Sequence, residues 1–307
     1  MNEKLAYARP STFPLDGSSE VNMWASKKDI SPVDRVKLSR HPNRPYLLDY
    51  VSFLFSKFSE LHGDRRIADD PAMICGFATF HDEPVVIIGH QKGRDLKSRL
   101  QRNFGMAKPE GYRKALRVMR LAEKFNRPIL TFIDTPGAYP GVDSEERSVA
   151  EAIAYNLREM SRLRTPIIAT IIGEGASGGA LGIAVADRVL MQENTYYTVI
   201  TPENCSTILY KDREEEHVSK TANALRLTAE DLKSFRMIDE IVAEPDGGAH
   251  ADYAGAAKLL DQAITRTLNE IRGWGAEERV QKRYERFRAI GSVQETAAQD
   301  WQRKKAG

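Results

Sequence analysis

The stretch IIATIIGEGASGGALGIAVAD, from Ile167 to Asp187, contains the pattern that decides the fold. Its first six residues are apolar or β-branched, which is typical of a buried strand. Glycines follow at positions 173, 175, 178 and 179, and the chain continues in small residues that favour a helix. A strand that leads into a helix through glycines leaves backbone N–H groups free at the helix start, where a phosphate or a reaction oxyanion can bind. The same glycines also permit close packing of helix on strand, and the stretch alone does not decide between these two interpretations.

Two known glycine motifs can be compared with this stretch. No Lys follows the glycines, so the spacing does not match the P-loop G-x-x-x-x-G-K-[ST]. Residues 175–179 do match the G-x-S-x-G nucleophile elbow of hydrolases, with Ser177 as the nucleophile. An elbow also needs a later carboxylate and histidine, and the two later histidines, His217 and His250, lie in polar segments without an evident orienting carboxylate. A serine hydrolase stays an alternative that the five-residue match alone does not favour.

Composition limits the classes of protein to consider. The chain has 307 residues, of which 41% are hydrophobic and 29% charged, as in ordinary soluble globular proteins. A net charge of +2 gives no argument for nucleic-acid binding, and no window is apolar enough to span a membrane. The N-terminal segment MNEKLAYARPSTFPLDG has no apolar core of signal-peptide length, and two cysteines suit a reducing compartment. We therefore expect a cytoplasmic protein, without a metal site because the six histidines are scattered.

Strand and helix patterns alternate along the middle of the chain, which favours an α/β fold built from βαβ units. Residues 73–80 and 85–89 are predicted to form an antiparallel hairpin, because a tight polar turn separates them. The spacing of apolar residues predicts one helix over residues 46–61. Further strands are predicted at 128–134, 166–172, 188–191, 196–200 and 237–243, and helices at 112–125, 145–163, 253–271 and 277–288. We expect a polar N-terminal arm over 1–45, a main domain over 46–275, and a charged helical tail over 276–307.

A second loop, DTPGAYPG (134–141), resembles GEGASGGA (173–180) in its position, since each follows a predicted strand and precedes a helix. In an α/β layout both loops open on the same edge of the sheet. The first loop offers the N–H groups of Gly137 and Ala138, and the second those of Gly178, Gly179 and Ala180. Donors from two adjacent loops fit an oxyanion hole that stabilises developing negative charge. Glycine and proline loops also occur at strand ends for steric reasons alone.

Other residues near these loops are candidates for binding or catalysis. Glu174 lies between two glycines, where it can act as a general acid or base or simply orient the loop by a hydrogen bond. Tyr139 can line a ligand pocket or pack. The basic stretch from Gln91 to Arg102 can attract phosphates or form a solvated loop face.

Several long segments resemble the α subunit of bacterial acetyl-CoA carboxylase carboxyltransferase, between about Arg44 and Ile271. They are RPYLLDYV, IIGHQKGR, NFGMAKPEGYRKALR, FIDTPGAYPGV, EERSVAEAIAYNLREMSRL, IGEGASGGALGI, TPENCSTILYKD and EPDGGAH. The resemblance implies a crotonase-like (ClpP/crotonase) fold of ββα spiral units. It also implies transfer of the carboxyl group of carboxybiotin, held on a biotin carboxyl carrier protein, to acetyl-CoA, giving malonyl-CoA. The implied partners are a zinc-bearing β subunit, commonly in an α2β2 complex with the active site at the interface, and biotin carboxylase.

The resemblance also implies roles for residues of this chain. The N–H groups of Gly178 and Gly179 would donate to the ureido oxygen of carboxybiotin, and Gly137 and Ala138 would supply the facing loop. The surrounding biotin-binding residues would be Gly175, Ser177, Ala180, Tyr139 and Glu174. Contacts to coenzyme A or to the carrier protein would come from Lys92, Arg94, Arg102 and Arg113.

Three alternatives besides the serine hydrolase stay open at this point. A related carboxyltransferase could use another small acyl-CoA, since the arm rich in Pro and Ser departs from the family pattern. A self-sufficient crotonase-type enzyme would need an acidic residue near the glycine loops, for which Glu174 is best placed. A non-enzymatic scaffold that binds a partner or RNA has only the basic stretches in its support.

Overall fold

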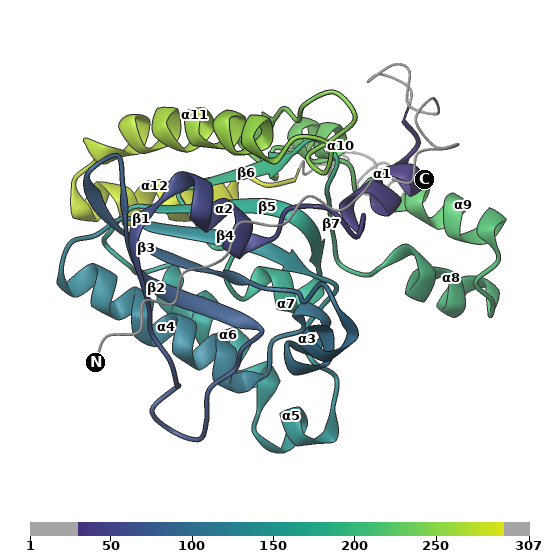
Figure 1. The fold of residues 1–307 in the computed structure, drawn as a ribbon, viewed down its shortest axis with the longest axis horizontal. Helices are drawn as coiled ribbons and strands as arrows, with labels where there is room; N and C mark the ends of the chain where they lie inside the picture. The colour runs from purple at the N-terminus through teal and green to yellow at the C-terminus, as the bar shows by residue number, and fades with distance from the viewer. Residues whose placement is uncertain (1–29, 292–307) are drawn as a thin grey trace, which may run out of the picture. The chain divides into compact units, whose positions relative to one another are not determined.

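The computed structural model describes residues 30–291, and Figure 1 shows how their helices and strands are arranged. Residues 1–29 and 292–307 lie outside the described residues, and with them most of the predicted arm and the end of the predicted tail.

Within residues 30–291, eight strands form one mixed sheet in the order β1-β2-β3-β4-β5-β6-β8, with β7 paired to β5. The first three strands are antiparallel, and β3, β4, β5, β6 and β8 run parallel to one another. The strands are β1 Ser56–Glu60, β2 Met73–Phe80, β3 Glu83–His90, β4 Ile129–Thr135, β5 Ile167–Ala176, β6 Arg188–Gln192, β7 Tyr196–Thr198 and β8 Glu240–Val242. The predicted 73–80/85–89 hairpin and the parallel middle of the sheet are both confirmed.

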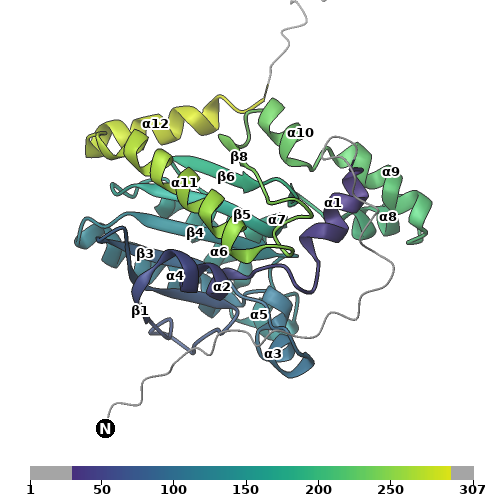
Figure 2. The same cartoon turned by 45° about the horizontal axis from the view of Figure 1, so that its top comes forward.

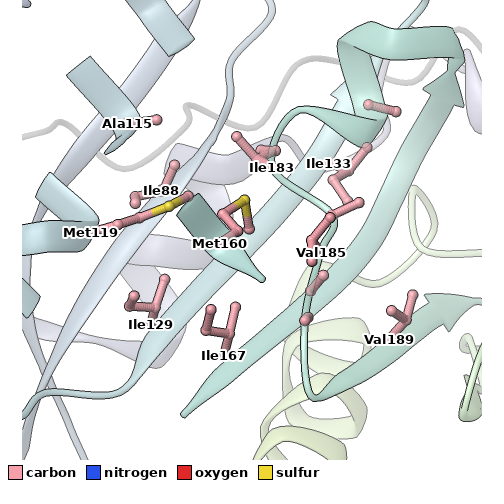
Figure 3. Close-up of a cluster of buried hydrophobic side chains, with 14 of the residues drawn as sticks. Ile88, Ala115, Met119, Ile129, Ile133, Met160, Ile167, Ile183, Val185 and Val189 are labelled. Atoms are coloured by element: carbon pink, nitrogen blue, oxygen red, sulfur yellow. The ribbon is translucent and has the colours of Figure 1, made fainter. Parts of the chain in front are cut away.

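Helices cover both faces of the sheet. α4 (Pro109–Lys124) and α6 (Val149–Met160) lie on one face, and α2 (Leu47–Leu54) and α11 (Tyr253–Arg272) lie on the other (Figures 1 and 2). The sheet is buried because alternate residues of each strand face opposite helix layers. Figure 3 shows part of the α4/α6 side, where Ile88, Ile129 and Ile167 of three neighbouring strands meet Met119 and Met160 of the helices.

The remaining helices lie around the edges of the sheet. α8 and α9 pack on each other and project away from the sheet in both views of the fold (Figures 1 and 2). The full set of remaining helices is α1 Pro32–Ser39, α3 Leu96–Gln101, the 3-10 turn η1 Asn103–Gly105, α5 Val142–Glu146, α7 Ser177–Leu181, α8 Pro202–Tyr210, α9 Glu215–Leu225, α10 Ala229–Ser234 and α12 Ala276–Arg288. Thr201 caps α8, and Pro202 is its first residue, a position that suits proline because the N–H it lacks would have no partner in the helix.

The single helix predicted over residues 46–61 is wrong in its second half. The helix ends at Leu54, Phe55 is extended, and residues 56–60 form the edge strand β1, which pairs with β2. The ring of Phe55 packs on Phe80 and Phe132 of the sheet. Tertiary pairing with β2 therefore outweighs the helical spacing of the apolar residues.

Two charged segments pack more closely than their composition suggests. Residues 31–45, placed in the predicted arm, contain α1 and the fully buried Arg44, whose guanidinium bonds to both carboxylate oxygens of Glu244. In the predicted solvated tail, α12 buries Arg283, which binds Asp187. Buried arginines are tolerated here because each one is paired with a carboxylate.

The longest helix between residues 30 and 291 is α11, and none in that range has the apolar character needed to cross a membrane.

Candidate active site

The two glycine-rich loops lie side by side at the carboxyl edge of the parallel sheet. β4 and β5 are adjacent parallel strands, so the loops that follow them open on the same edge. A Cβ atom built on Gly179 would stand 2.3 Å from the carbonyl carbon of Gly137 and 2.4 Å from the nitrogen of Ala138. Only glycine fits at position 179, since backbone of the other loop occupies the place of a side chain. The expectation that the loops share one edge is confirmed.

Strand β5 continues through the glycines as far as Ala176, and the helix α7 that follows has only five residues, Ser177–Leu181. Gly178 and Gly179 are its second and third residues, so their N–H groups have no carbonyl partner within the helix. So short a helix adds little dipole, and the donors act as individual N–H groups. Ser177 is exposed beside them and has a φ of +57°.

The facing loop offers fewer donors than the sequence suggests. Gly137 has a φ of +151°, which favours glycine. Its N–H donates to the Thr135 hydroxyl at 3.1 Å, and the same hydroxyl donates to the Gly137 carbonyl at 2.6 Å. The N–H of Gly137 is therefore already used inside its own turn. The donor that this loop can present to a ligand is the N–H of Ala138, next to Gly179.

Gly175 and Ala180 are buried beneath the glycine loops and do not line an open surface. Gly175 pairs with Tyr197 of β7, and a Cβ on it would stand 3.0 Å from the Tyr197 ring. Ala180 is fully buried. The Tyr112 hydroxyl of α4 donates to the Gly179 carbonyl at 3.1 Å, which fixes the peptide that joins Gly179 to Ala180.

Glu174 is held from several sides and does not project into open space. One carboxylate oxygen accepts from Lys92 at 2.7 Å, and the other accepts from Arg40 and from the Tyr196 hydroxyl, each at 2.7 Å. Burial acts to raise the pKa of this carboxyl, but the charges of Lys92 and Arg40 lower it to about 2. A carboxylate so occupied and so acidic does not serve as a general base near neutral pH, which leaves loop orientation as its role.

The four basic residues expected to contact coenzyme A or the carrier do not form one surface. Lys92 is largely buried and bridges Asp134 and Glu174. Arg94 pairs with Asp49, Arg102 donates to the Pro71 carbonyl, and Arg113 pairs with Asp64 and Glu110. Only Lys92 lies beside the glycine loops, and it is neither a solvated cation nor an exposed phosphate ligand.

Tyr139 lies partly exposed in the loop after Ala138, with the ammonium of Lys108 4.7 Å from its ring centre. Its N–H donates to the Ala107 carbonyl, so this backbone group does not face a ligand. The ring packs against Gly141, where a Cβ would stand 2.3 Å from its Cε1 atom, and a role for Tyr139 in a ligand pocket stays a prediction.

The histidines do not complete a serine hydrolase. His217 has an orienting carboxylate, Asp212 at 2.9 Å, which sequence spacing did not reveal, but its ring stacks on Tyr210 of α8. His250 stacks on His41. His90, at the end of β3, is fully buried, and burial together with the nearby Lys92 charge lowers its pKa to about 3.

The sequence pattern did not single out Asp134, Arg40 or Tyr196, which the structure brings to Glu174. Asp134 is the residue with the clearest signal, because it ends a buried strand at the start of the DTPG turn. Its carboxylate accepts the Glu174 N–H at 2.9 Å. Among residues 30–291, no group of three or more His, Cys, Asp or Glu side chains is arranged to hold a metal ion.

Solved structures of carboxyltransferases share this fold. A transcarboxylase 12S structure with hydrolyzed methylmalonyl-coenzyme A bound aligns with a TM-score of 0.60 and 15% identity over 80% of this chain, which spans 46% of that one. A Pseudomonas malonate decarboxylase hetero-tetramer in complex with coenzyme A aligns with a TM-score of 0.57 and 15% identity over 78% of this chain and 90% of that one. The protein therefore has the crotonase-like fold, with two backbone loops meeting at one sheet edge.

Sequence relatives identify the family within this fold. Residues 15–291 match the acetyl co-enzyme A carboxylase carboxyltransferase-like family, and the chain belongs to it. A relative from Gemmatimonas aurantiaca is 54% identical over 87% of this chain and 84% of its own length. One from Thermus thermophilus is 49% identical over 96% and 89%. Both relatives are named acetyl-coenzyme A carboxylase carboxyl transferase subunit alpha.

Proposed function

We propose that this chain is the α subunit of an acetyl-CoA carboxylase carboxyltransferase, and that its two glycine loops bind the carboxybiotin side of the reaction. The enzyme moves a carboxyl group from carboxybiotin on a carrier protein to acetyl-CoA and yields malonyl-CoA. The observation that carries the site assignment is the contact of Gly179 with the backbone of Gly137 and Ala138. This contact places the backbones of the two loops, with their N–H groups, next to each other.

The chemistry requires charge stabilisation that these loops can supply. When the N–C bond of the carboxyl group breaks, negative charge develops on the ureido oxygen of biotin. The N–H groups of Gly178 and Gly179, with Ala138 opposite, donate to that oxygen. Preorganised donors of this kind contribute about 3 kcal/mol each to transition-state stabilisation, or roughly 100-fold in rate.

The proton and the new bond can be accounted for without a protein base. The ureido group that has lost CO2 takes a proton from the methyl group of acetyl-CoA, and the enolate attacks the CO2. This explains why Glu174 can be fully committed to Lys92, Arg40 and Tyr196. The chain's own contribution in this step is to hold the ureido oxygen with backbone N–H groups.

A second chain completes the site in this proposal. Apolar side chains stand exposed on the segments that follow the strand ends, among them Val142 at 76%, Val199 at 75% and Leu181 at 36% exposure. Exposed apolar groups around a site favour a protein interface. The proposed partner is a zinc-bearing β subunit in an α2β2 complex, working with the biotin carboxyl carrier protein and biotin carboxylase in the cytoplasm.

The test is carboxyl exchange by the purified chain with a β partner, biotin or carboxybiotin, and acetyl-CoA. Gly178→Val is the diagnostic variant, because a Cβ there meets only Ile153, at an ordinary 3.7 Å. We expect the added methyls to restrict access of the ureido oxygen to the N–H groups. The variant should assemble and lose exchange activity. Gly273→Val is a matched control, since a Cβ at Gly273 meets nothing within 4 Å.

Three outcomes would change the proposal. Exchange by the chain alone would contradict the subunit assignment. Wild-type rates from Gly178→Val would contradict the biotin-hole assignment. Faster exchange with propionyl-CoA than with acetyl-CoA would assign the enzyme to another small acyl-CoA.

A further inference from the structure

A buried ammonium joins the two glycine loops at their bases. The Nζ atom of Lys92 lies 2.6 Å from Oδ1 of Asp134 and 2.7 Å from Oε1 of Glu174. Asp134 lies three residues before Gly137, and Glu174 lies four residues before Gly178. One side chain from a third segment, just after β3, therefore binds the acidic residue at the base of each loop.

The backbone at this point depends on the same contacts. Between the pairs Ile133↔Ile171 and Thr135↔Gly175, β4 advances by two residues and β5 by four, so β5 bulges at Gly173 and Glu174. The Glu174 N–H donates to Asp134 Oδ1 at 2.9 Å. A Cβ on Gly173 would stand 2.2 Å from that oxygen, so glycine is needed for the close approach. The carboxylate of Asp134 thus holds both the bulge and the ammonium.

The cluster is enclosed rather than displayed on the surface. The side chains of Lys92, Asp134 and Glu174 are 11%, 2% and 8% exposed. Gly105 closes over them with a φ of +84°, and a Cβ on it would stand 2.9 Å from Cγ of Lys92 and 3.0 Å from the Asp134 carbonyl. Two carboxylates this close repel each other strongly when no cation lies between them, and Lys92 is the cation that contacts both, since Arg40 contacts Glu174 but not Asp134.

We propose that Lys92 is a positioning residue that sets the distance between the two glycine loops, and with it the arrangement of the N–H groups of Ala138, Gly178 and Gly179. This inference rests on the proposed function only for its effect on rate. It replaces the role of phosphate or carrier contact that the basic stretch suggested for Lys92.

Lys92→Met tests the inference, because it keeps the length of the side chain and removes the charge. Lys114→Met is the matched control: Lys114 is also buried, and it binds Asp69 and the Asp70 carbonyl away from both loops. In the α–β complex, Lys92→Met should lower kcat for exchange roughly 100-fold, because displacement of a reacting group by about 1 Å costs that much. The KM for acetyl-CoA should stay within about threefold, and Lys114→Met should keep the wild-type kcat.

The pH profile separates positioning from general damage. Without the ammonium, Asp134 loses the cation that contacts it, whereas Glu174 keeps Arg40 and the Tyr196 hydroxyl, and the neighbouring His90 is neutral in this pH range. Asp134 should therefore take up a proton at higher pH, and its neutral form can donate to Glu174. The kcat of Lys92→Met relative to wild type should therefore recover as the pH falls from 8 to 6. A ratio that does not change with pH, or equal loss in Lys114→Met, would overturn the inference.

Amide hydrogen exchange gives a readout that does not depend on activity. Lys92→Met should speed exchange in the peptides covering 135–141 and 173–181, and Lys114→Met should not. Unchanged exchange in both loops of Lys92→Met would overturn the positioning role. A wild-type complex without carboxyl exchange would instead contradict the proposed function, and the amide result would still decide the role of Lys92.

Discussion

Strand β5 has a buried ion cluster at each end, and the two clusters differ in what they hold. At the amino end, Asp187 accepts from Arg283 and from the N–H of Ile167. Arg283 also donates to the carbonyls of Met160 and Leu163 at 2.7 Å. At the carboxyl end, Lys92 binds Asp134 and Glu174 at the bases of the two glycine loops, in which Gly137, Ala138 and Gly178 are partly exposed. The first cluster joins α12 to the segment between α6 and β5 and to the residue before β6, and the second joins the ends of β4 and β5, from which the glycine loops extend.

Burial of charge therefore does not identify a functional site by itself. Both clusters pair their charges, as buried ions must. The carboxyl edge of a parallel sheet is where ligands bind in α/β proteins, because loops there can vary without disturbing the strands. The position of the Lys92 cluster at that edge separates it from the Arg283 cluster. Substitutions at the two ends should accordingly divide between activity and stability.

The largest effect should come from Gly179→Ala at the carboxyl end. The added Cβ would stand 2.3 Å from the carbonyl carbon of Gly137, which is backbone and cannot rotate away. The loops must separate, and the loss of aligned donors should lower kcat for exchange by 100- to 1000-fold, about 3–4 kcal/mol. The measurement is exchange kinetics on a complex whose assembly is verified by size-exclusion chromatography. An assembled Gly179→Ala complex with wild-type kcat would show that the close contact of the loops has no part in catalysis.

Arg283→Met should give the next largest effect, at the amino end and on stability. Removing the guanidinium leaves Asp187 with the Ile167 N–H and, as a cation, Arg279, whose Nη1 lies 3.5 Å away. It also removes the donor to three carbonyls, those of Met160, Leu163 and Thr165. Loss of one partner of a buried pair costs about 3–5 kcal/mol, to be measured by urea unfolding. The kcat of the folded complex should stay at the wild-type value. Arg288→Met on the exposed end of the same helix is the control, with a change within about 0.5 kcal/mol.

The adjacency of the two glycine loops was predictable from sequence because it follows from local patterns alone. Two apolar strands, each followed by a glycine loop and a helix, become parallel neighbours, and the carboxyl ends of parallel strands share an edge. The contact of Gly179 with Gly137 follows from that register. The edge strand after Leu54 was not predictable in the same way. Its apolar spacing suits a helix, and only pairing with β2 makes it a strand.

The partners of Glu174 were beyond local inference for a different reason. Lys92 lies 82 residues away and Arg40 lies 134 residues away in the sequence. A lysine in a basic stretch is usually solvated, and its burial here depends on the fold of the η1 turn around Gly105. A sequence pattern shows the net charge of a segment such as Gln91 to Arg102. Long-range packing decides which of its charged side chains is buried.

The smallest expected effect is a change in the free energy of unfolding with pH, and it concerns only the carboxyl end of β5. His90 is fully buried beside the carboxyl-end cluster, and its pKa is lowered from 6.5 to about 3, mainly by burial. The unfolded chain binds this proton below pH 6.5 and the folded chain does not, so the stability that the neutral ring contributes is complete above pH 6.5 and is lost progressively toward pH 3. At pH 5.5 the free energy of unfolding should be about 1.4 kcal/mol lower than at pH 7.5 because of this group.

His90→Leu should remove that part of the pH dependence, since leucine does not titrate and the site is already desolvated. The comparison is the difference in unfolding free energy between pH 7.5 and 5.5, measured with urea for wild type, His90→Leu and Arg283→Met. His90→Leu should show the smaller difference, whatever its stability at pH 7.5, and Arg283→Met should keep the wild-type contribution of His90. An identical pH dependence in His90→Leu and wild type would mean that folding does not lower the pKa of His90, so that the ring is protonated in the folded chain at pH 5.5. The carboxyl-end cluster would then carry one more positive charge beside Lys92 than the structure indicates.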